Sequence, residues 1–180
     1  IPKKIKMIKK KFQILKKKIK DLDIDGYIVP KNDEFFSEYA FTDRLKTISN
    51  FTGSAGVAVI LINKNYLFVD GRYTVQAKQQ SGKNFTIVEI HKYLPKKILK
   101  NLTLGIDPSI FTEKHLKPFI NKSVKIRSIK ENLIDKNYLK KKKKINKIFS
   151  INNEIVGESH ISKIKKIRSV LESNKSDYLF

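Results

Sequence analysis

The alternation of apolar and polar positions at the start of the chain predicts an amphipathic helix. Six apolar residues recur at spacings of three and four, which places them on one stripe of a helix: Ile5, Ile8, Phe12, Leu15, Ile19 and Leu22. The opposite face carries Lys9, Lys10, Lys16 and Lys17, as expected for a solvated surface. Basic helices that lie on membranes share this pattern. A strand signal follows almost at once, which favours packing on a sheet.

Short apolar runs then alternate with helical stretches. The runs predict strands at residues 27–29, 57–62, 66–69, 85–90, 102–106 and 124–129. Between them, helices are predicted at 44–48, from the N-cap Asp70 through Gln80, at 94–100 entered through Pro95, and at 113–120 capped by Thr112. The turn at 63–65 joins two of the strands as a hairpin. This order predicts an α/β fold with a mixed, mostly parallel sheet flanked by helices.

The composition changes after residue 132. The unbroken lysine run 140–144 repels itself and indicates a linker or exposed loop. Ile161, Ile164, Ile167 and Leu171 then mark a second amphipathic helix, and a strand is expected from Asp177. We therefore expect a first domain at 1–138, a lysine-rich linker or loop at 139–153, and the opening helix and strand of a second, similar α/β domain at 154–180.

Composition narrows the classes of protein. Hydrophobic residues make up 40% of the 180 residues, which is enough to build a core although 31% are charged. The longest strongly apolar run, 57–62, is far shorter than a membrane span, and the lysine-rich N-terminus does not read as a signal peptide. The chain has no cysteine, which excludes disulfides and thiolate sites. The expected compartment is the cytoplasm.

The formal net charge of +22 has two explanations. One is a basic module that binds nucleic acid or another polyanion. The other is compositional drift, because lysine, isoleucine and asparagine are abundant together and share A/T-rich codons. Phosphate or base recognition would be expected to raise arginine as well. Arginine is present only at Arg44, Arg72, Arg127 and Arg168, which favours drift.

The residue types that carry catalysis form no pattern in the sequence. His91, His115 and His160 fall in different predicted elements and lack metal-ligand spacing, so each is interpreted as an ordinary surface or core histidine. Ser54 is not in a nucleophile elbow. Gly53 and Gly56 precede a strand and suit a sharp turn or close packing, whereas a phosphate loop precedes a helix.

Four segments, taken in order and spacing, resemble the N-terminal region of the Xaa-Pro aminopeptidases of the creatinase/aminopeptidase P family. They are 25–30 (DGYIVP), 37–39 (SEY), 51–56 (FTGSAG) and 69–77 (VDGRYTVQA). Weaker similarities lie at 105–108 (GIDP) and 131–135 (ENLID). One departure is Asn50, where many relatives have glycine, and it bears on the local turn.

The resemblance implies a three-domain, cytosolic, dimeric metallopeptidase that removes the N-terminal residue preceding a proline. A pair of divalent metal ions (Mn, Co or Zn) is expected in a catalytic domain outside this chain. The metal ligands of that domain have no counterpart here, so no catalytic, metal-binding or cofactor-binding residue is assigned to this chain. The expected partners are the catalytic domain and a second subunit of the parent protein, with no membrane and no specific nucleic acid.

Arg72 is the one candidate contact residue. It follows the N-cap Asp70 and lies in the first turn of the predicted helix, where a positive charge opposes the helix dipole. An acidic neighbour is therefore expected, either Asp70 or the loop containing Asp33 and Glu34. The family's domain arrangement suggests a second role, in which Arg72 faces the catalytic domain and helps to position the substrate or a partner subunit.

Overall fold

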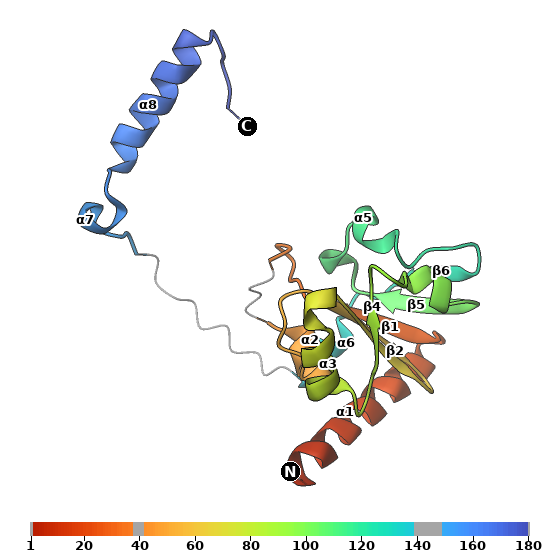
Figure 1. The fold of residues 1–180 in the computed structure, drawn as a ribbon. Helices are drawn as coiled ribbons and strands as arrows, with labels where there is room; N and C mark the ends of the chain where they lie inside the picture. The colour runs from red at the N-terminus through yellow and green to blue at the C-terminus, as the bar shows by residue number, and fades with distance from the viewer. Residues whose placement is uncertain (1, 38–41, 139–148, 180) are drawn as a thin grey trace. The chain divides into compact units, whose positions relative to one another are not determined.

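The computed structural model describes residues 2–37, 42–138 and 149–179. The chain forms two compact units, Ile1–Lys140 and Lys141–Phe180 (Figure 1). The predicted linker at 139–153 lies mostly outside the described residues, so the domain boundaries stay a prediction.

A six-stranded sheet forms the centre of the first unit, with the strand order β4-β3-β2-β1-β5-β6. The strands are β1 Gly26–Pro30, β2 Gly56–Leu61, β3 Asn65–Val69, β4 Thr86–Glu89, β5 Leu102–Ile106 and β6 Val124–Ser128. Each coincides with an apolar run in the sequence, and the central strand β1 is buried throughout. The mixed α/β fold predicted from the sequence is confirmed.

The strand directions decide which loops meet. β1 pairs parallel with β5, β5 with β6, and β3 with β4, whereas β2 runs antiparallel to both β1 and β3. Among these strands, β2 is thus the one that runs opposite to the others, and it forms the hairpin with β3 that the turn at 63–65 predicts. The carboxyl ends of five strands therefore lie at one edge of the sheet, together with the amino end of β2.

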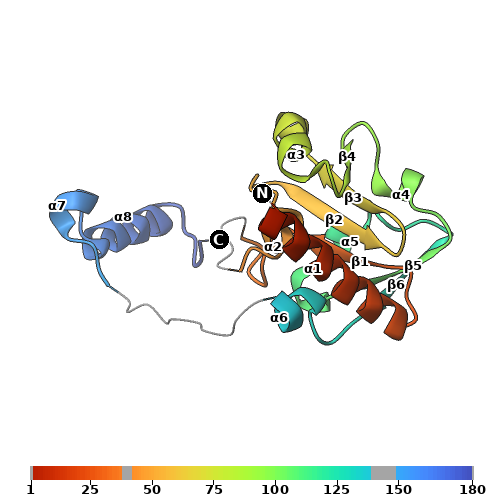
Figure 2. The ribbon, with the colours of Figure 1, turned by 90° about the horizontal axis from the view of Figure 1, so that it is seen from below.

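One face of the sheet is covered by α1 Pro2–Asp21, α2 Arg44–Ser49, α3 Thr74–Ser81 and α6 Leu133–Tyr138. The predicted stripe of α1 is confirmed where its side chains are described, because Phe12, Leu15 and Ile19 are buried in this core. In Figure 2, α1 runs across the strands. Of the lysines predicted to be solvated, Lys10 and Lys17 are exposed and Lys16 is partly buried. Lys11 Nζ donates to the Thr47 carbonyl at 2.9 Å, and partial burial lowers the pKa of the Lys11 and Lys16 amines.

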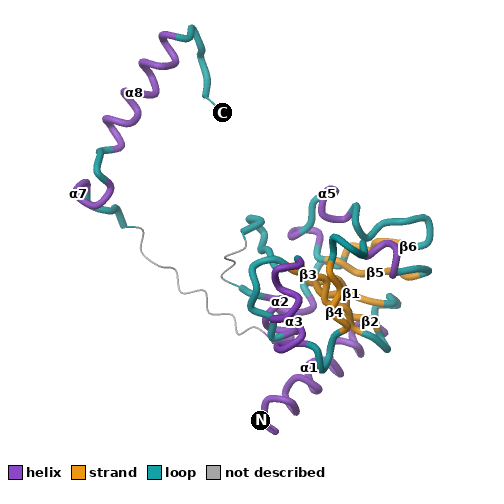
Figure 3. The backbone as a smooth tube through the Cα atoms, viewed as in Figure 1, coloured by secondary structure: helices purple, strands orange, loops and turns teal. Residues whose placement is uncertain are grey.

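The other face packs against shorter elements, namely α4 Pro95–Ile98, the 3₁₀ turn η2 Pro108–Ile110 and α5 Glu113–Leu116. The alternation of side chains along a strand assigns Ile28, Val59 and Phe68 to this second core. The sheet therefore lies between two helical layers, which Figure 3 shows as orange strands among purple helices. α4 and α5 are shorter than the predicted 94–100 and 113–120.

A buried polar network ties α2 to α6. Arg44 is 5% exposed, and its guanidinium donates to both oxygens of Asp135 at 2.7 Å each and approaches Glu34 at 3.5 Å. Burial lowers the pKa of Arg44, but the hydrogen bonds and charge of Asp135 outweigh it, so the pKa lies above its ordinary value. Arginine suits such a bidentate pair because its planar guanidinium presents two N–H donors that match the two carboxylate oxygens.

The two weaker similarity segments meet in the same region. Asn132 Nδ2 donates to Asp107 Oδ2 at 2.8 Å, and the backbone N–H of Leu133 lies 3.4 Å from the Tyr27 hydroxyl. Burial raises the pKa of Tyr27. The acids and amides of these segments therefore serve the packing of α6 on the sheet, and none of them is an acid–base pair.

The second unit contains α7 Asn153–Val156 and α8 His160–Ser173. Ser159 caps α8 by accepting a hydrogen bond from the backbone N–H of Ser162. The predicted stripe exists but stays exposed: Ile161, Ile164 and Ile167 are 57%, 46% and 42% exposed. Residues 177–179 form no strand, contrary to the expectation from Asp177. A single strand is not stable, because its backbone N–H and C=O groups need a neighbouring strand for hydrogen bonds.

Candidate binding pocket at the carboxyl edge of the sheet

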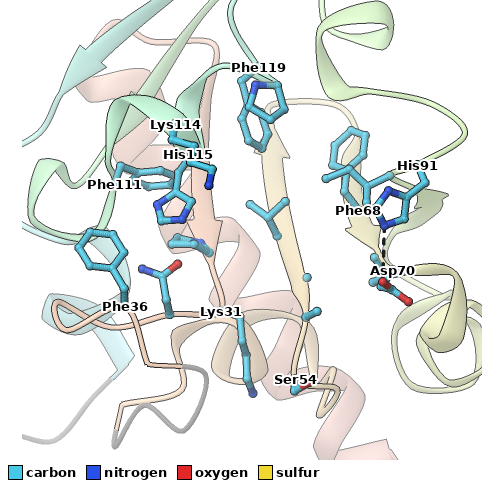
Figure 4. Close-up of a pocket in the computed structure, with 18 residues that line it drawn as sticks. Lys31, Phe36, Ser54, Phe68, Asp70, His91, Phe111, Lys114, His115 and Phe119 are labelled. Carbon is cyan, nitrogen blue, oxygen red and sulfur yellow. Dashed lines mark ion pairs between the residues drawn. The ribbon is translucent and has the colours of Figure 1, made fainter. Parts of the chain in front are cut away.

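A pocket of about 480 Å³ opens at the edge where the strands' carboxyl ends meet. Its lining comes from the segments after β1, β3, β4 and β5 and from the segment that leads into β2 (Figure 4). After β1 the chain turns to α2 on one face, whereas after β5 it turns to η2 and α5 on the other. Connections that diverge in this way leave a crevice outside the carboxyl ends of the strands, which is where α/β sheets bind ligands.

Aromatic and aliphatic side chains form most of the pocket wall. Phe68 and Phe119 are 0% and 3% exposed, and their rings meet edge to face with centroids 6.4 Å apart. Val57, Ile90 and Phe111 extend this wall. A ligand with an apolar body would therefore bury surface against rings that are already fixed by the core.

Lys114 and His115 lie on one side of the pocket, beside Phe111 (Figure 4). Thr112 holds this turn, because its hydroxyl accepts from the His115 backbone N–H and lies 3.1 Å from His115 Nδ1. The N-cap role predicted for Thr112 is thus confirmed. Among the described residues, no acidic side chain forms an ion pair with Lys114.

The opposite side of the pocket carries Asp70 and His91 (Figure 4). Asp70 Oδ1 accepts from the side-chain Nε and the backbone N–H of Arg72 at 2.9 and 3.0 Å, and Oδ2 lies 3.5 Å from His91 Nε2. These hydrogen bonds, the Arg72 side chain first, lower the pKa of Asp70 to about 2. Asp70 is therefore ionised at neutral pH, and its charge is already compensated.

Arg72 itself is not one of the lining residues. Its side chain is 75% exposed, pairs with Asp70, and stands 5.6 Å from the ring centroid of Tyr73. The acidic neighbour expected from the helix-dipole argument is thus Asp70, although the first turn is the 3₁₀ helix η1 Gly71–Tyr73 that precedes α3. Whether Arg72 contacts substrate or another domain stays a prediction.

The segment after β1 forms the rim. Asn32 Nδ2 donates to the Ile110 carbonyl at 2.9 Å, which joins the two diverging loops, and Lys31 pairs with Asp43. Phe36 has a positive φ of 57° and stacks on His115 with centroids 5.2 Å apart. A bulky residue with positive φ is unusual. Here Asp33 Oδ1 stabilises the turn by accepting from the N–H groups of Phe35 and Ser37.

The fold brings together residues that the sequence kept apart. His91 and His115 were interpreted as unrelated, but both line this pocket, whereas His160 lies in α8. Their positions in the sequence could have predicted this, because each histidine follows a strand. The carboxyl ends of parallel strands lie at the same edge of the sheet. Within the described residues, no group of three His, Asp or Glu side chains could hold a metal ion.

The glycine segment before β2 serves packing. A Cβ at Gly53 would lie 2.3 Å from the Phe51 ring, and one at Gly56 would lie 3.0 Å from it. This agrees with close packing before a strand. The nearby Ser54 hydroxyl lies 2.9 Å from the Tyr73 hydroxyl. In the described part of the chain, no helix has the length and apolar character to cross a bilayer.

Comparison with known proteins gives a consistent match. A family described as the creatinase/prolidase N-terminal domain matches residues 11–133. A probable Xaa-Pro aminopeptidase P of Coprinopsis cinerea is 36% identical over 70% of this chain. The aligned part is 22% of that relative, so the chain spans about a fifth of the curated protein it matches.

Solved structures agree on the fold. The X-prolyl aminopeptidase of Caenorhabditis elegans, described as a cytosolic enzyme with a di-nuclear active site, superposes with a TM-score of 0.65 at 22% identity. The match covers 94% of this chain and 32% of that one. The N-terminal domain of the cytoplasmic peptidase PepQ from Mycobacterium tuberculosis matches at 0.54 and 19% identity, over 70% of this chain and 96% of that domain.

Proposed function

Since the chain belongs to the creatinase/prolidase N-terminal domain family, we propose that it is the non-catalytic N-terminal region of a metal-dependent Xaa-Pro aminopeptidase. The observation that carries the proposal is the 36% identity to a probable Xaa-Pro aminopeptidase P, confined to 22% of that relative. The parent protein removes an N-terminal residue that precedes proline. Its pair of Mn, Co or Zn ions is held outside the residues described here, and it acts in the cytoplasm as a homodimer.

The role we assign to this region is assembly and control of access to the active site. The two-layered core gives it a rigid sheet, and the loops at the carboxyl edge are positioned by that sheet. The relatives named above are peptidases, which gives the polyanion-binding alternative no support.

Arg72 is the residue through which we propose contact with the substrate or with another domain or subunit. Its side chain is 75% exposed, and the hydrogen bond from Nε to Asp70 holds the guanidinium in place at the protein surface. An exposed but positioned arginine suits a carboxylate or carbonyl on a neighbouring surface.

The proposed function is tested by comparing X-Pro peptide hydrolysis by this 180-residue chain and by a longer protein that contains it. Metal hydrolysis requires ligands at fixed geometry to activate water. We expect the longer protein, with Mn²⁺, Co²⁺ or Zn²⁺ added, to release the residue before proline and to leave an X-Ala peptide intact. The 180-residue chain should not exceed a metal-only control. Turnover by the short chain, or X-Ala cleavage at an equal rate by the long one, would contradict the proposal.

A further inference from the structure

We propose that the pocket at the carboxyl edge of the sheet binds a small monocarboxylate with an apolar or aromatic body. The inference is independent of the proposed peptidase activity, because it rests only on the pocket's shape and charge. A volume of about 480 Å³ lies within the usual range for small-ligand sites. The pocket also lies where the connections from β1 and β5 diverge, which is where α/β sheets bind ligands.

The apolar body is assigned to the ring-lined wall. Phe111, Val57 and Ile90 line this space and are only partly buried. Phe68 and Phe119 also border it, but they are 0% and 3% exposed, so they support the wall from within the core. Rings in a fixed core lose no further freedom when a ligand packs on them. Phe36 adds a further ring at the rim, where it is 42% exposed and stacked on His115.

The negative headgroup follows from the charges around the pocket. Lys31 is paired with Asp43, and Asp70 is paired with Arg72 and lies near His91. Lys114 is the charged lining residue without an acidic partner among the described residues, and the His115 ring lies beside it. The pocket therefore carries a surplus positive charge on the side of Lys114, opposite Asp70.

One ammonium group beside an apolar wall suits a carboxylate better than a phosphate. A phosphate dianion needs several converging donors, whereas a carboxylate is satisfied by Lys114 with one further N–H such as that of the His115 ring. Because Arg72 compensates Asp70 and Asp43 compensates Lys31, Lys114 supplies the surplus charge of the lining, which matches one negative group on the ligand. A cationic ligand would meet Lys114 with no uncompensated acid in reach.

Isotope-edited NMR on the 180-residue chain tests this with four probes: 3-phenylpropionate, its neutral amide, 3-phenylpropylamine and acetate. We expect 3-phenylpropionate to bind with a dissociation constant on the order of 1 mM, a normal affinity for so small a molecule. The amides of Asn32, Asp70, His91 and His115 should shift. The neutral amide should bind roughly three- to tenfold more weakly, and the amine and acetate should not bind measurably.

Two pairs of variants separate charge from apolar contact. Lys114→Gln should reduce the affinity for 3-phenylpropionate to that for the amide, whereas Lys117→Gln, an exposed lysine outside the lining, should change nothing. Phe36→Ala should weaken acid and amide equally, whereas Phe35→Ala, 83% exposed and outside the lining, should not. All four positions are at least partly exposed, so folding is expected to survive and is checked from the spectra.

Three outcomes overturn the proposal. The first is the absence of pocket shifts at millimolar 3-phenylpropionate, and the second is equal binding of acid and amine. The third is equal weakening by Lys114→Gln and Lys117→Gln, which would reduce the effect to a general attraction of acids to a basic surface.

Discussion

Asn50 adopts a left-handed backbone conformation with φ 64° and ends α2, its N–H donating to the Lys46 carbonyl at 2.8 Å. The family resemblance of the sequence led us to expect glycine at this position. Left-handed φ penalises a Cβ, but asparagine tolerates it better than most residues. The departure noted from the sequence therefore preserves the turn, because asparagine is the natural second choice at such a helix end.

Substitution at Asn50 gives the first prediction. Asn50→Ala should lower the free energy of unfolding by roughly 1 kcal/mol and Asn50→Val by roughly 1–2 kcal/mol, whereas Asn50→Gly should stay within about 0.5 kcal/mol of the parent chain. Urea denaturation measures this. Asn63→Ala is the control, since Asn63 is an exposed loop asparagine whose φ is not positive. Equal losses for Asn50→Ala and Asn63→Ala would show that backbone handedness is not the cause.

Arg72 carries the second prediction at this scale. Arg72→Ala removes the side-chain donor that lowers the Asp70 pKa but keeps the backbone N–H of residue 72. The Asp70 pKa should therefore rise from about 2 toward its ordinary value without reaching it. The folded-state pKa is depressed, so the stability from this contact is present above about pH 4 and is lost as the pH falls toward 2. A carboxyl-carbon NMR titration measures the shift.

The same variant tests the proposed contact. In a longer protein with X-Pro activity, Arg72→Ala should lower kcat/KM by about two- to fivefold, the range for one exposed charge contact, while Tm at neutral pH falls only slightly because an exposed ion pair contributes little stability. Lys78→Ala, an exposed lysine on α3, serves as the control. A lower Tm with unchanged kcat/KM would leave Arg72 only its ion pair with Asp70.

At the scale of elements, strands were predicted well and short helices less well. Strands β1, β2 and β3 coincide with dense apolar runs, which favour burial on both faces of the sheet, whereas β6 is marked by apolar residues that alternate with polar ones. The sequence did not predict α6, because Leu133–Tyr138 is held by the ion pair between Asp135 and Arg44, which lies 91 residues away in the sequence.

The pocket was not predicted either, because it too depends on contacts between distant segments. Its lining is assembled by the parallel pairing of β1 with β5 and β3 with β4, and sequence spacing does not display that pairing.

Among the described elements, α8 is the one that we expect to be least stable. Its apolar stripe is exposed, and an isolated helix of 14 residues is marginal in water. We expect amides of His160–Ser173 to exchange far faster than those of Gly56–Leu61 in β2, because local opening of α8 uncovers little buried surface. Hydrogen exchange followed by NMR measures both segments in one experiment. α1 is the internal control, since it is also helical but buries Phe12, Leu15 and Ile19. Protection of α8 equal to that of β2 would show that its stripe is covered in solution.

At the scale of the whole molecule, the charge of +22 is the feature that the fold does not explain. Described lysines are spread over α1, α4, α5, β6 and α8 in both units. Three of the four arginines have assigned contacts within the protein: Arg44 with Asp135, Arg72 with Asp70, and Arg127 with the Leu22 carbonyl at 2.7 Å. Arginine is the residue type best suited to recognising phosphates and bases, and most of the arginines here are thus engaged in contacts within the protein.

This distribution predicts how the chain meets a polyanion. Scattered lysines release counterions but recognise no pattern, so binding to duplex DNA should be weak, indifferent to sequence and steeply dependent on salt. Fluorescence anisotropy with two unrelated duplexes of equal length should give equal affinities at about 20 mM salt, and no measurable binding at about 150 mM, where the Debye length has fallen to about 8 Å. Heparin should compete with both duplexes equally, because it offers the same charge without bases. A preference for one duplex that persists at the higher salt would require a built recognition surface, and it would count against compositional drift as the origin of the lysines.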